Sequence, residues 1–197
     1  MTRAPECLAR PHIRVNGEIG DATLTAFLDQ LEEAGEADPL VVEVTTVGGD
    51  AEIGRRLALE LRSLQAAGRK VLFLGKTVIY SAGVTMMAPV PAERRWLTPD
   101  AVLLVHCRKL NKTLELNEAL RLSKAKVEGL LREIEVGMRL QQEGFDELAR
   151  GSKVTADDVA RNAEQEWYVP AEEAVELGLV AGIWDPATAA EAANEAA

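Results

Sequence analysis

The chain has 197 residues, and its 47% hydrophobic content suits one domain, spanning 1–197, with a well-formed core. A formal net charge of -10 and the lack of an aromatic-plus-basic face argue against a nucleic-acid-binding surface. No apolar stretch reaches the roughly 18 residues of a membrane span and the first residues lack a signal-peptide pattern, so we expect a cytoplasmic protein without membrane contact.

Strands and helices alternate along the chain, which predicts an α/β fold with a largely parallel sheet. A first helix is expected from about Asp21, and a second after Gly48-Gly49-Asp50 that stops near Gly68. Thr155 and Asp158 have the spacing of a capping box and open a later helix. Strands are expected at 12–16, 40–46, 70–75 and 101–106, with a short edge piece around 95–97.

Residues 113–150 are free of proline and rich in Leu, Glu, Lys and Arg, with apolar residues three or four positions apart. This spacing predicts one long helix. Its apolar stripe is wider than one domain face would cover, so we expect burial against another subunit in a homo-oligomer. The Ala- and Glu-rich tail at 186–197 is expected to fray.

Ser81 is the first candidate for chemistry, because it lies between an apolar strand and a short apolar helix. The first N–H groups of a helix are unpaired and carry partial positive charge, which stabilises a developing oxyanion. Ala82 and Gly83 leave room for a substrate backbone. A serine at this position is more often a simple helix cap, so the case depends on its partners.

His106 and a glycine pair supply those partners. His106 ends a buried strand, at the sheet edge where sites assemble in α/β proteins, whereas His12 lies in a polar, alternating segment. Gly48 and Gly49 end another strand. The N–H groups of Gly49 and Ala82 would make a two-donor oxyanion hole. A phosphate-binding loop is the alternative for such glycines, but neither phosphate motif is present.

These residues resemble the ClpP branch of the ClpP/crotonase superfamily: a strand ending in Gly-Gly, a strand-to-helix serine, and a later strand ending in His. The segments 13–19 and 170–180 are similar to that family's first strand and closing helix, so the resemblance covers residues 12–185. It implies a spiral of β-β-α units, with 113–150 as the projecting handle helix through which two rings dock.

The same resemblance implies a catalytic set. Ser81 would be the nucleophile and His106 the general base, with the N–H groups of Gly49 and Ala82 as the oxyanion hole. The family has an aspartate shortly before the closing helix, and Glu166 stands at the matching position here, with Glu164 and Asp185 as fallbacks. Glutamate can orient an imidazole, but its extra methylene requires a different backbone distance.

The resemblance implies a serine endopeptidase that cleaves peptides or unfolded polypeptide within an oligomeric ring. A basic stretch, 108–112, replaces the family's Gly-rich strand. We also expect the family's N-terminal axial segment to be absent, which leaves coupling to an unfoldase ATPase open. A stand-alone ring peptidase and a phage-type maturation protease both fit. A non-catalytic ring subunit and a crotonase-type acyl-CoA enzyme are the alternatives.

Cofactors and metals are not expected. His, Cys and carboxylate residues show no metal-ligand spacing. Cys7 and Cys107 lie in different contexts and predict no disulfide, which fits a reducing compartment.

Overall fold

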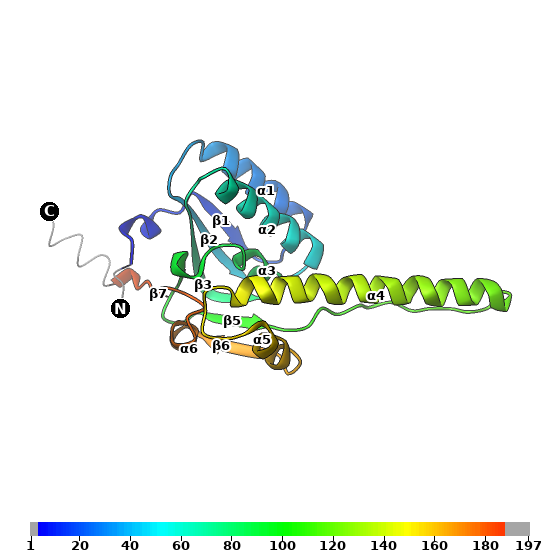
Figure 1. Cartoon of the computed structure of the whole chain (residues 1–197). Helices are drawn as coiled ribbons and strands as arrows, with labels where there is room; N and C mark the ends of the chain where they lie inside the picture. The colour runs from blue at the N-terminus through cyan, green and yellow to red at the C-terminus, as the bar shows by residue number, and fades with distance from the viewer. Residues whose placement is uncertain (1–3, 188–197) are drawn as a thin grey trace, which may run out of the picture.

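A computed structural model describes residues 4–187. Within these residues seven strands form one sheet, in which β1, β2, β3, β4 and β7 are neighbours in that order, while β5 pairs with β3 and β6 pairs with β5 (Figure 1). All pairs are parallel except β5 with β6. The strands are β1 (Ile13–Asn16), β2 (Leu40–Thr46), β3 (Val71–Tyr80), β4 (Arg95–Leu97), β5 (Val102–Val105), β6 (Trp167–Pro170) and β7 (Gly182–Ile183).

The helices and 3-10 turns fill the connections between these strands. Helices α1 and α2 lie together beside β1 and β2, while α5 and α6 lie near β5 and β6 (Figure 1). Their bounds are η1 (Glu6–Ala9), α1 (Asp21–Glu33), α2 (Ala51–Ala66), α3 (Ala82–Met87), η2 (Ala92–Arg94), α4 (Leu120–Ala149), α5 (Ala156–Ala163) and α6 (Ala171–Glu176).

Alternating residues of the central strands build two apolar clusters. Val42 and Phe73 belong to the larger one, which also contains residues of α1, α2 and α3. Val41 and Leu72 belong to a smaller one that includes Leu8 of η1. Because successive side chains of a strand point to opposite faces, these clusters lie on the two faces of the sheet. In the chain from 4 to 187, no helix is both long and apolar enough to cross a membrane.

Strand β3 is longer than the expected 70–75 and changes partner along its length. Its first half pairs with β4 and its second half with β5, while the register against β2 shifts between Val44 and Thr46. Thr77 has a φ of 58° at this break. The bulge bends the strand, and the strand then continues to Tyr80, directly before the candidate nucleophile.

Two other expectations are wrong in detail. The piece around 95–97 is not an edge, because β4 is buried and pairs with both β3 and β7. The segment 167–170 forms strand β6, which the sequence does not predict because its short apolar run lacks a clear period. By contrast, the capping box is confirmed, since Thr155 and Asp158 exchange hydrogen bonds at the start of α5.

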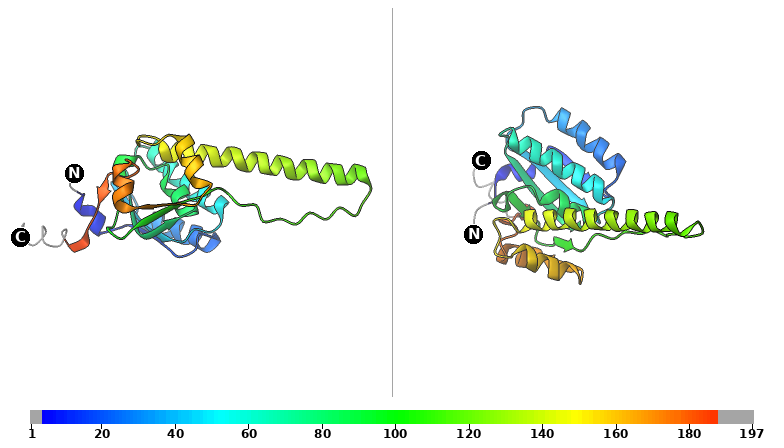
Figure 2. Two further views of the ribbon diagram at one scale, coloured as in Figure 1. Left: turned by 90° about the horizontal axis from the view of Figure 1, so that it is seen from below. Right: turned by 45° about the vertical axis from the view of Figure 1, so that its right-hand side comes forward.

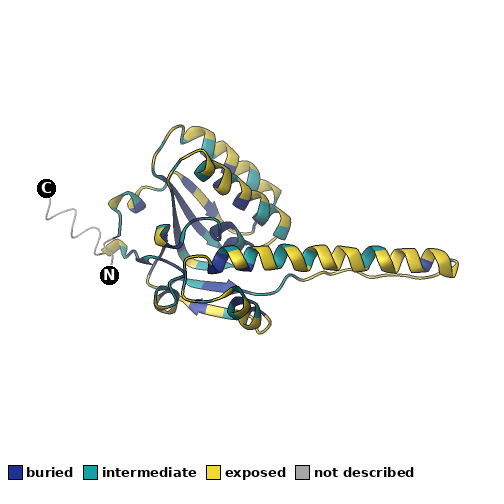
Figure 3. Ribbon diagram, in the orientation of Figure 1, coloured by how far each residue is buried: buried dark blue, intermediate teal, exposed yellow. Residues whose placement is uncertain are grey.

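The handle helix α4 begins at Leu120 rather than 113. The residues before it are extended and run beside the helix (Figures 1 and 2), and Lys112 Nζ contacts Glu133 Oε2 at 2.6 Å. Leu114 and Leu116 alternate with polar residues, a spacing typical of extended chain. Figure 3 shows α4 exposed along its projecting part and buried at its base. The expected frayed tail falls mostly on residues 188–197, outside the described residues.

A buried arginine ties the base of α4 to the rest of the domain. Arg95 is 1% exposed, and its guanidinium donates to the carbonyl oxygens of Val90, Leu148, Leu179 and Ala88. Burial lowers its pKa to about 10, which leaves the side chain cationic at neutral pH. Ala88 and Leu148 lie at the C-terminal ends of α3 and α4, where carbonyls lack intrahelical donors.

Replacing Arg95 by Met should therefore destabilise the protein. Four buried carbonyl oxygens would lose a donor, and because part of this loss is offset by removing a buried charge, we expect the free energy of unfolding to fall by about 3 kcal/mol. Urea denaturation followed by circular dichroism measures it. Arg94→Met, in the neighbouring partly exposed position, is the matched control, and an equal effect of both substitutions would contradict the assignment.

Candidate active site

Ser81 is the N-cap of α3 and has an unusual backbone conformation. Its φ is 54° and its ψ -110°, a region that residues with a side chain rarely adopt and that costs about 1–3 kcal/mol. Its N–H donates to the Leu104 carbonyl of β5 at 2.9 Å, and its carbonyl accepts from Val84 and Thr85. The neighbouring strand and helix thus hold the serine at a sharp turn.

The glycine pair approaches this turn closely. A Cβ added at Gly48 would lie 2.8 Å from Ser81 Cβ, so only glycine leaves room for the serine there. At Gly49, with φ 146°, an added Cβ would lie 2.2 Å from the Ile19 carbonyl oxygen. Asp50 then caps α2 by accepting from the N–H groups of Glu52 and Ile53. Two segments of chain far apart in sequence therefore meet at Ser81.

Both expected oxyanion-hole donors are available. Across residues 4–187, the N–H groups of Gly49 and Ala82 donate to no protein acceptor, whereas the Ser81 N–H is already used. Ala82 N–H is also one of the first donors of α3, which have no acceptor inside the helix. Free backbone donors beside a hydroxyl are what stabilisation of a tetrahedral oxyanion requires.

His106 follows β5 directly, and its Nδ1 lies 2.7 Å from the carbonyl oxygen of Cys107. A carbonyl oxygen only accepts hydrogen bonds, so this contact places the proton on Nδ1. In the neutral ring Nε2 then keeps its lone pair, which is the arrangement a general base needs. The other histidine, His12, has a structural contact instead: its Nδ1 accepts from the Val41 N–H at 3.0 Å, and its side chain does not line the cavity beside Ser81.

One cavity of about 270 Å³ joins the catalytic candidates. Ser81, His106, Gly49 and Ala82 all line it, so the structure brings together the predicted nucleophile, base and oxyanion donors. The base of α4 closes another wall. That wall and the neighbouring part of α3 are largely apolar, with lining side chains Val84, Ala88, Leu140, Phe145 and Leu148.

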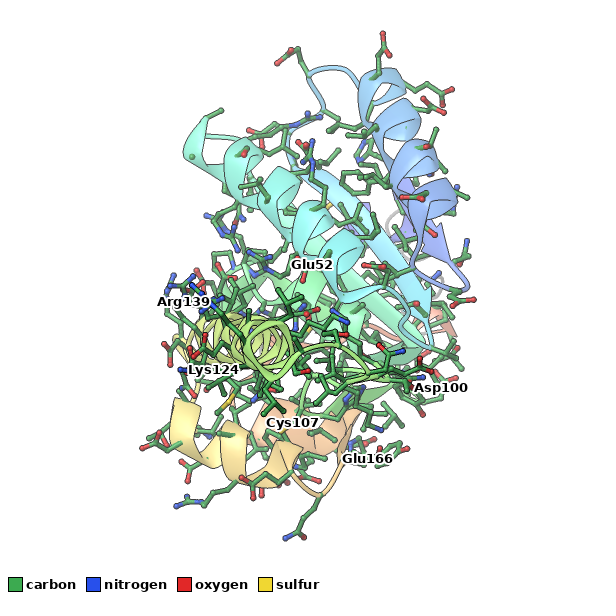
Figure 4. All side chains as sticks on the ribbon, turned by 90° about the vertical axis from the view of Figure 1, so that its right-hand side faces the viewer. Glu52, Asp100, Cys107, Lys124, Arg139 and Glu166 are labelled. Carbon is green, nitrogen blue, oxygen red and sulfur yellow. The ribbon has the colours of Figure 1, made fainter. Side chains whose placement is uncertain are left out.

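Glu166 does not line this cavity; its carboxylate is bound by Lys109, with Nζ 2.9 Å from Oε1. The Lys109 hydrogen bond and charge lower the pKa of Glu166, and the charge of His106 acts in the same direction. Figure 4 shows Glu166 and Cys107 on the side of α5 and β6, and Glu52 on the side of α2. The charge of His106 thus acts on the Glu166 carboxylate, but each group is bound to another partner.

The two fallback acids are also outside the cavity lining. Glu164 is the exposed C-cap of α5; burial, followed by the charge of Glu164, raises the pKa of the Cys107 thiol. Asp185 follows β7 and accepts from the Ala187 N–H at 2.9 Å. The charge of His106 contributes to the lowered pKa of Glu166.

The sequence does not predict Arg55 and Gln141, which both line the cavity. Arg55 lies one helical turn after Ala51, so its place near Gly49 follows once α2 is known to start there. Gln141 has no comparable signal, because its position depends on how α4 packs. Within the described part of the chain, no group of three His, Cys, Asp or Glu side chains is arranged to hold a metal ion.

Comparison with known proteins identifies the family of the chain. The Clp protease family model matches residues 5–187. The chain is 25% identical over 143 residues to the ATP-dependent Clp protease proteolytic subunit 2 of Pseudomonas aeruginosa, covering 73% of this chain and 64% of that subunit. The match thus spans slightly less than two thirds of the length of that relative.

A solved structure is similar as well. The chain matches a ClpP1 mutant from Listeria monocytogenes with a TM-score of 0.72 and 16% identity, over 93% of this chain and 96% of that one. This match confirms the expected ClpP-like α/β fold. Because the sequence identity is only 16%, it supports the fold alone. The family model spans nearly all described residues. The chain therefore belongs to the Clp protease family.

Proposed function

We propose that this chain is a serine-type peptidase. Ser81 Oγ attacks the scissile carbonyl, His106 Nε2 accepts the hydroxyl proton and returns it to the leaving amine, and water then hydrolyses the acyl-enzyme. The N–H groups of Gly49 and Ala82 bind the oxyanion. The observation that carries the proposal is that one cavity is lined by the serine, the histidine and both donors.

The substrate proposed is a peptide or an unfolded polypeptide. The apolar wall from α3 and α4 suits one apolar side chain, and an extended peptide can lie along the exposed segment that follows Arg108. Cys7 and Cys107 are free thiols, which fits the proposed cytoplasmic location.

Ser81→Ala should abolish labelling by a fluorophosphonate probe and hydrolysis of fluorogenic peptides, because Ser81 is the hydroxyl placed beside the free N–H groups. Mass spectrometry of the labelled peptide locates the adduct and separates Ser81 from Thr85, which also lines the cavity. Ser63→Ala, on the exposed face of α2, is the control and should label normally. Labelling that survives in Ser81→Ala would refute the assignment.

Glu166 is the third member in this proposal, provided that its carboxylate leaves Lys109 for His106 Nδ1. The opposing observation is that the Cys107 carbonyl already occupies Nδ1. This arrangement favours a second candidate, a ring subunit without catalytic activity, in which the acid never engages.

Glu166→Gln tests whether Glu166 acts as the third catalytic residue. If the carboxylate stabilises the imidazolium, kcat should fall by about 10- to 100-fold with little change in KM, because the interaction forms in the transition state. Steady-state peptide hydrolysis measures it, with Glu164→Gln as the matched control. An unchanged kcat would show that the Cys107 carbonyl is sufficient to orient His106, and a wild type without activity or probe labelling would favour the non-catalytic subunit.

A homo-oligomer built through α4 is also proposed. Five apolar side chains at helical spacing are exposed along one face of the helix: Leu120, Val127, Leu131, Ile134 and Met138. An exposed apolar stripe of this length typically marks a contact with another chain. The projecting part of α4 is largely exposed (Figure 3).

The double substitution Leu131→Glu with Ile134→Glu should therefore give a smaller species in light scattering at micromolar concentration, with the circular dichroism spectrum unchanged. Arg139→Glu is the control, because it changes the net charge by the same two units on another face of α4. A monomeric wild type, or equal dissociation of both variants, would contradict burial of this stripe between subunits.

A further inference from the structure

The charged side chains that line the cavity are all cationic. Arg55, Arg108 and Lys109 line it together with Ser81, while no Asp or Glu among residues 4–187 does so. This is unexpected in a chain whose formal net charge is -10. The site thus presents a local positive charge within an acidic protein.

Two of these cations share one carboxylate. Glu52 accepts from Arg55, with Nη1 and Oε2 2.6 Å apart, and also from Arg108. Burial acts to raise the pKa of Glu52, but the hydrogen bonds and charges of the two arginines outweigh it and the pKa is lowered, so the carboxylate is ionised at neutral pH. Two guanidinium groups against one carboxylate leave a positive charge that is not neutralised there.

The basic stretch 108–112 is held against α4 at Arg108. The Arg108 N–H donates to Gln141 Oε1 of α4 at 2.7 Å, and Gln141 itself lines the cavity. Lys109 binds Glu166, but its side chain is 73% exposed, so its ammonium can also reach a ligand in the cavity. Arg108 is therefore anchored through its backbone, while its side chain faces the site.

We propose that this site prefers peptides with an acidic side chain close to the scissile bond, next to an apolar side chain that fills the wall made by α3 and α4. The inference rests on the proposed peptidase function. Guanidinium groups pair with carboxylates through a fork of N–H donors, so Arg55 and Arg108 suit an Asp or Glu side chain. A substrate lysine would meet like charge, which disfavours binding.

The test uses fluorogenic peptides that differ only in one residue, Glu, Gln or Lys, placed in turn at each of three positions on either side of the cleaved bond. At the preferred position kcat/KM should rank Glu over Gln over Lys, by about five-fold between Glu and Gln, as expected for a partly exposed ion pair. The preference should shrink as the salt concentration rises. Amidated peptides separate an acidic side chain from a free C-terminal carboxylate, and a preference that disappears on amidation would overturn the side-chain assignment.

Arg55→Gln and Arg108→Gln should each reduce the ratio of Glu to Gln peptides toward one. Lys112→Gln is the matched control: it removes the same charge and lies in the same segment as Arg108, but Lys112 pairs with Glu133 and does not line the cavity. An equal loss in Lys112→Gln would mean a general effect of net charge, and would overturn the proposal.

Peptide binding to Ser81→Ala, measured by fluorescence polarisation, keeps the two proposals distinguishable. Hydrolysis without any charge preference refutes the inference and leaves the peptidase intact. Tighter binding of the Glu peptide without hydrolysis by the wild type refutes the peptidase and supports the acidic preference. Equal binding of the Glu, Gln and Lys peptides, or binding of none of them, refutes the inference.

Discussion

The whole site depends on one close approach, between the glycine pair after β2 and the turn at Ser81. A Cβ at Gly48 would come within 2.8 Å of Ser81 Cβ, so the absence of a side chain sets how near the two strand ends can lie. The bulge in β3 is the other half of this constraint. Because β3 leaves β4 and joins β5 after Thr77, the serine arrives beside the strand that carries His106. The candidate oxyanion donors, the Ser81 hydroxyl and the His106 imidazole are thus placed by backbone geometry, with few side-chain contacts.

Helix α4 links this site to the surface. Its base supplies Phe145 and Leu148 to the cavity wall, and the Leu148 carbonyl accepts from buried Arg95, while its outer turns expose an apolar stripe. A helix is stiff along its axis, so whatever covers the outer stripe also limits how the base can move. Contacts between subunits would then stabilise the cavity in the same way that a ligand stabilises the state to which it binds. In such an assembly, subunit contacts and the shape of the cavity would be physically coupled.

Much of the fold is predictable because its signals are local. The strand before Gly48, the cap of α5 and the ends of α2 depend on residues adjacent in sequence, and all agree with the structure. The predictions are wrong where contacts between residues distant in sequence determine the structure. Strand β4 is internal because β7 pairs with it, and α4 starts late because the preceding residues run back along the helix. Four of the residues that line the cavity can be predicted as neighbours, because each ends or follows a strand at one sheet edge: Ser81, His106, Gly49 and Ala82. The position of Gln141 cannot be predicted in this way, because it depends on how α4 packs.

Glu166, the proposed third catalytic group, is paired with Lys109, which is one of the cations that line the cavity. Its carboxylate is exposed and paired with an even more exposed lysine, and such pairs are weak because water screens both charges. An acidic substrate side chain and Glu166 would compete for the same Lys109 ammonium. Substrate binding at Lys109 would then release Glu166 toward His106, where the imidazolium of the proposed mechanism would attract a carboxylate. In that case the basic stretch 108–112 would have two functions. The Lys109 ammonium would favour an acidic substrate, and it would also hold Glu166, the proposed third catalytic group, until substrate binds.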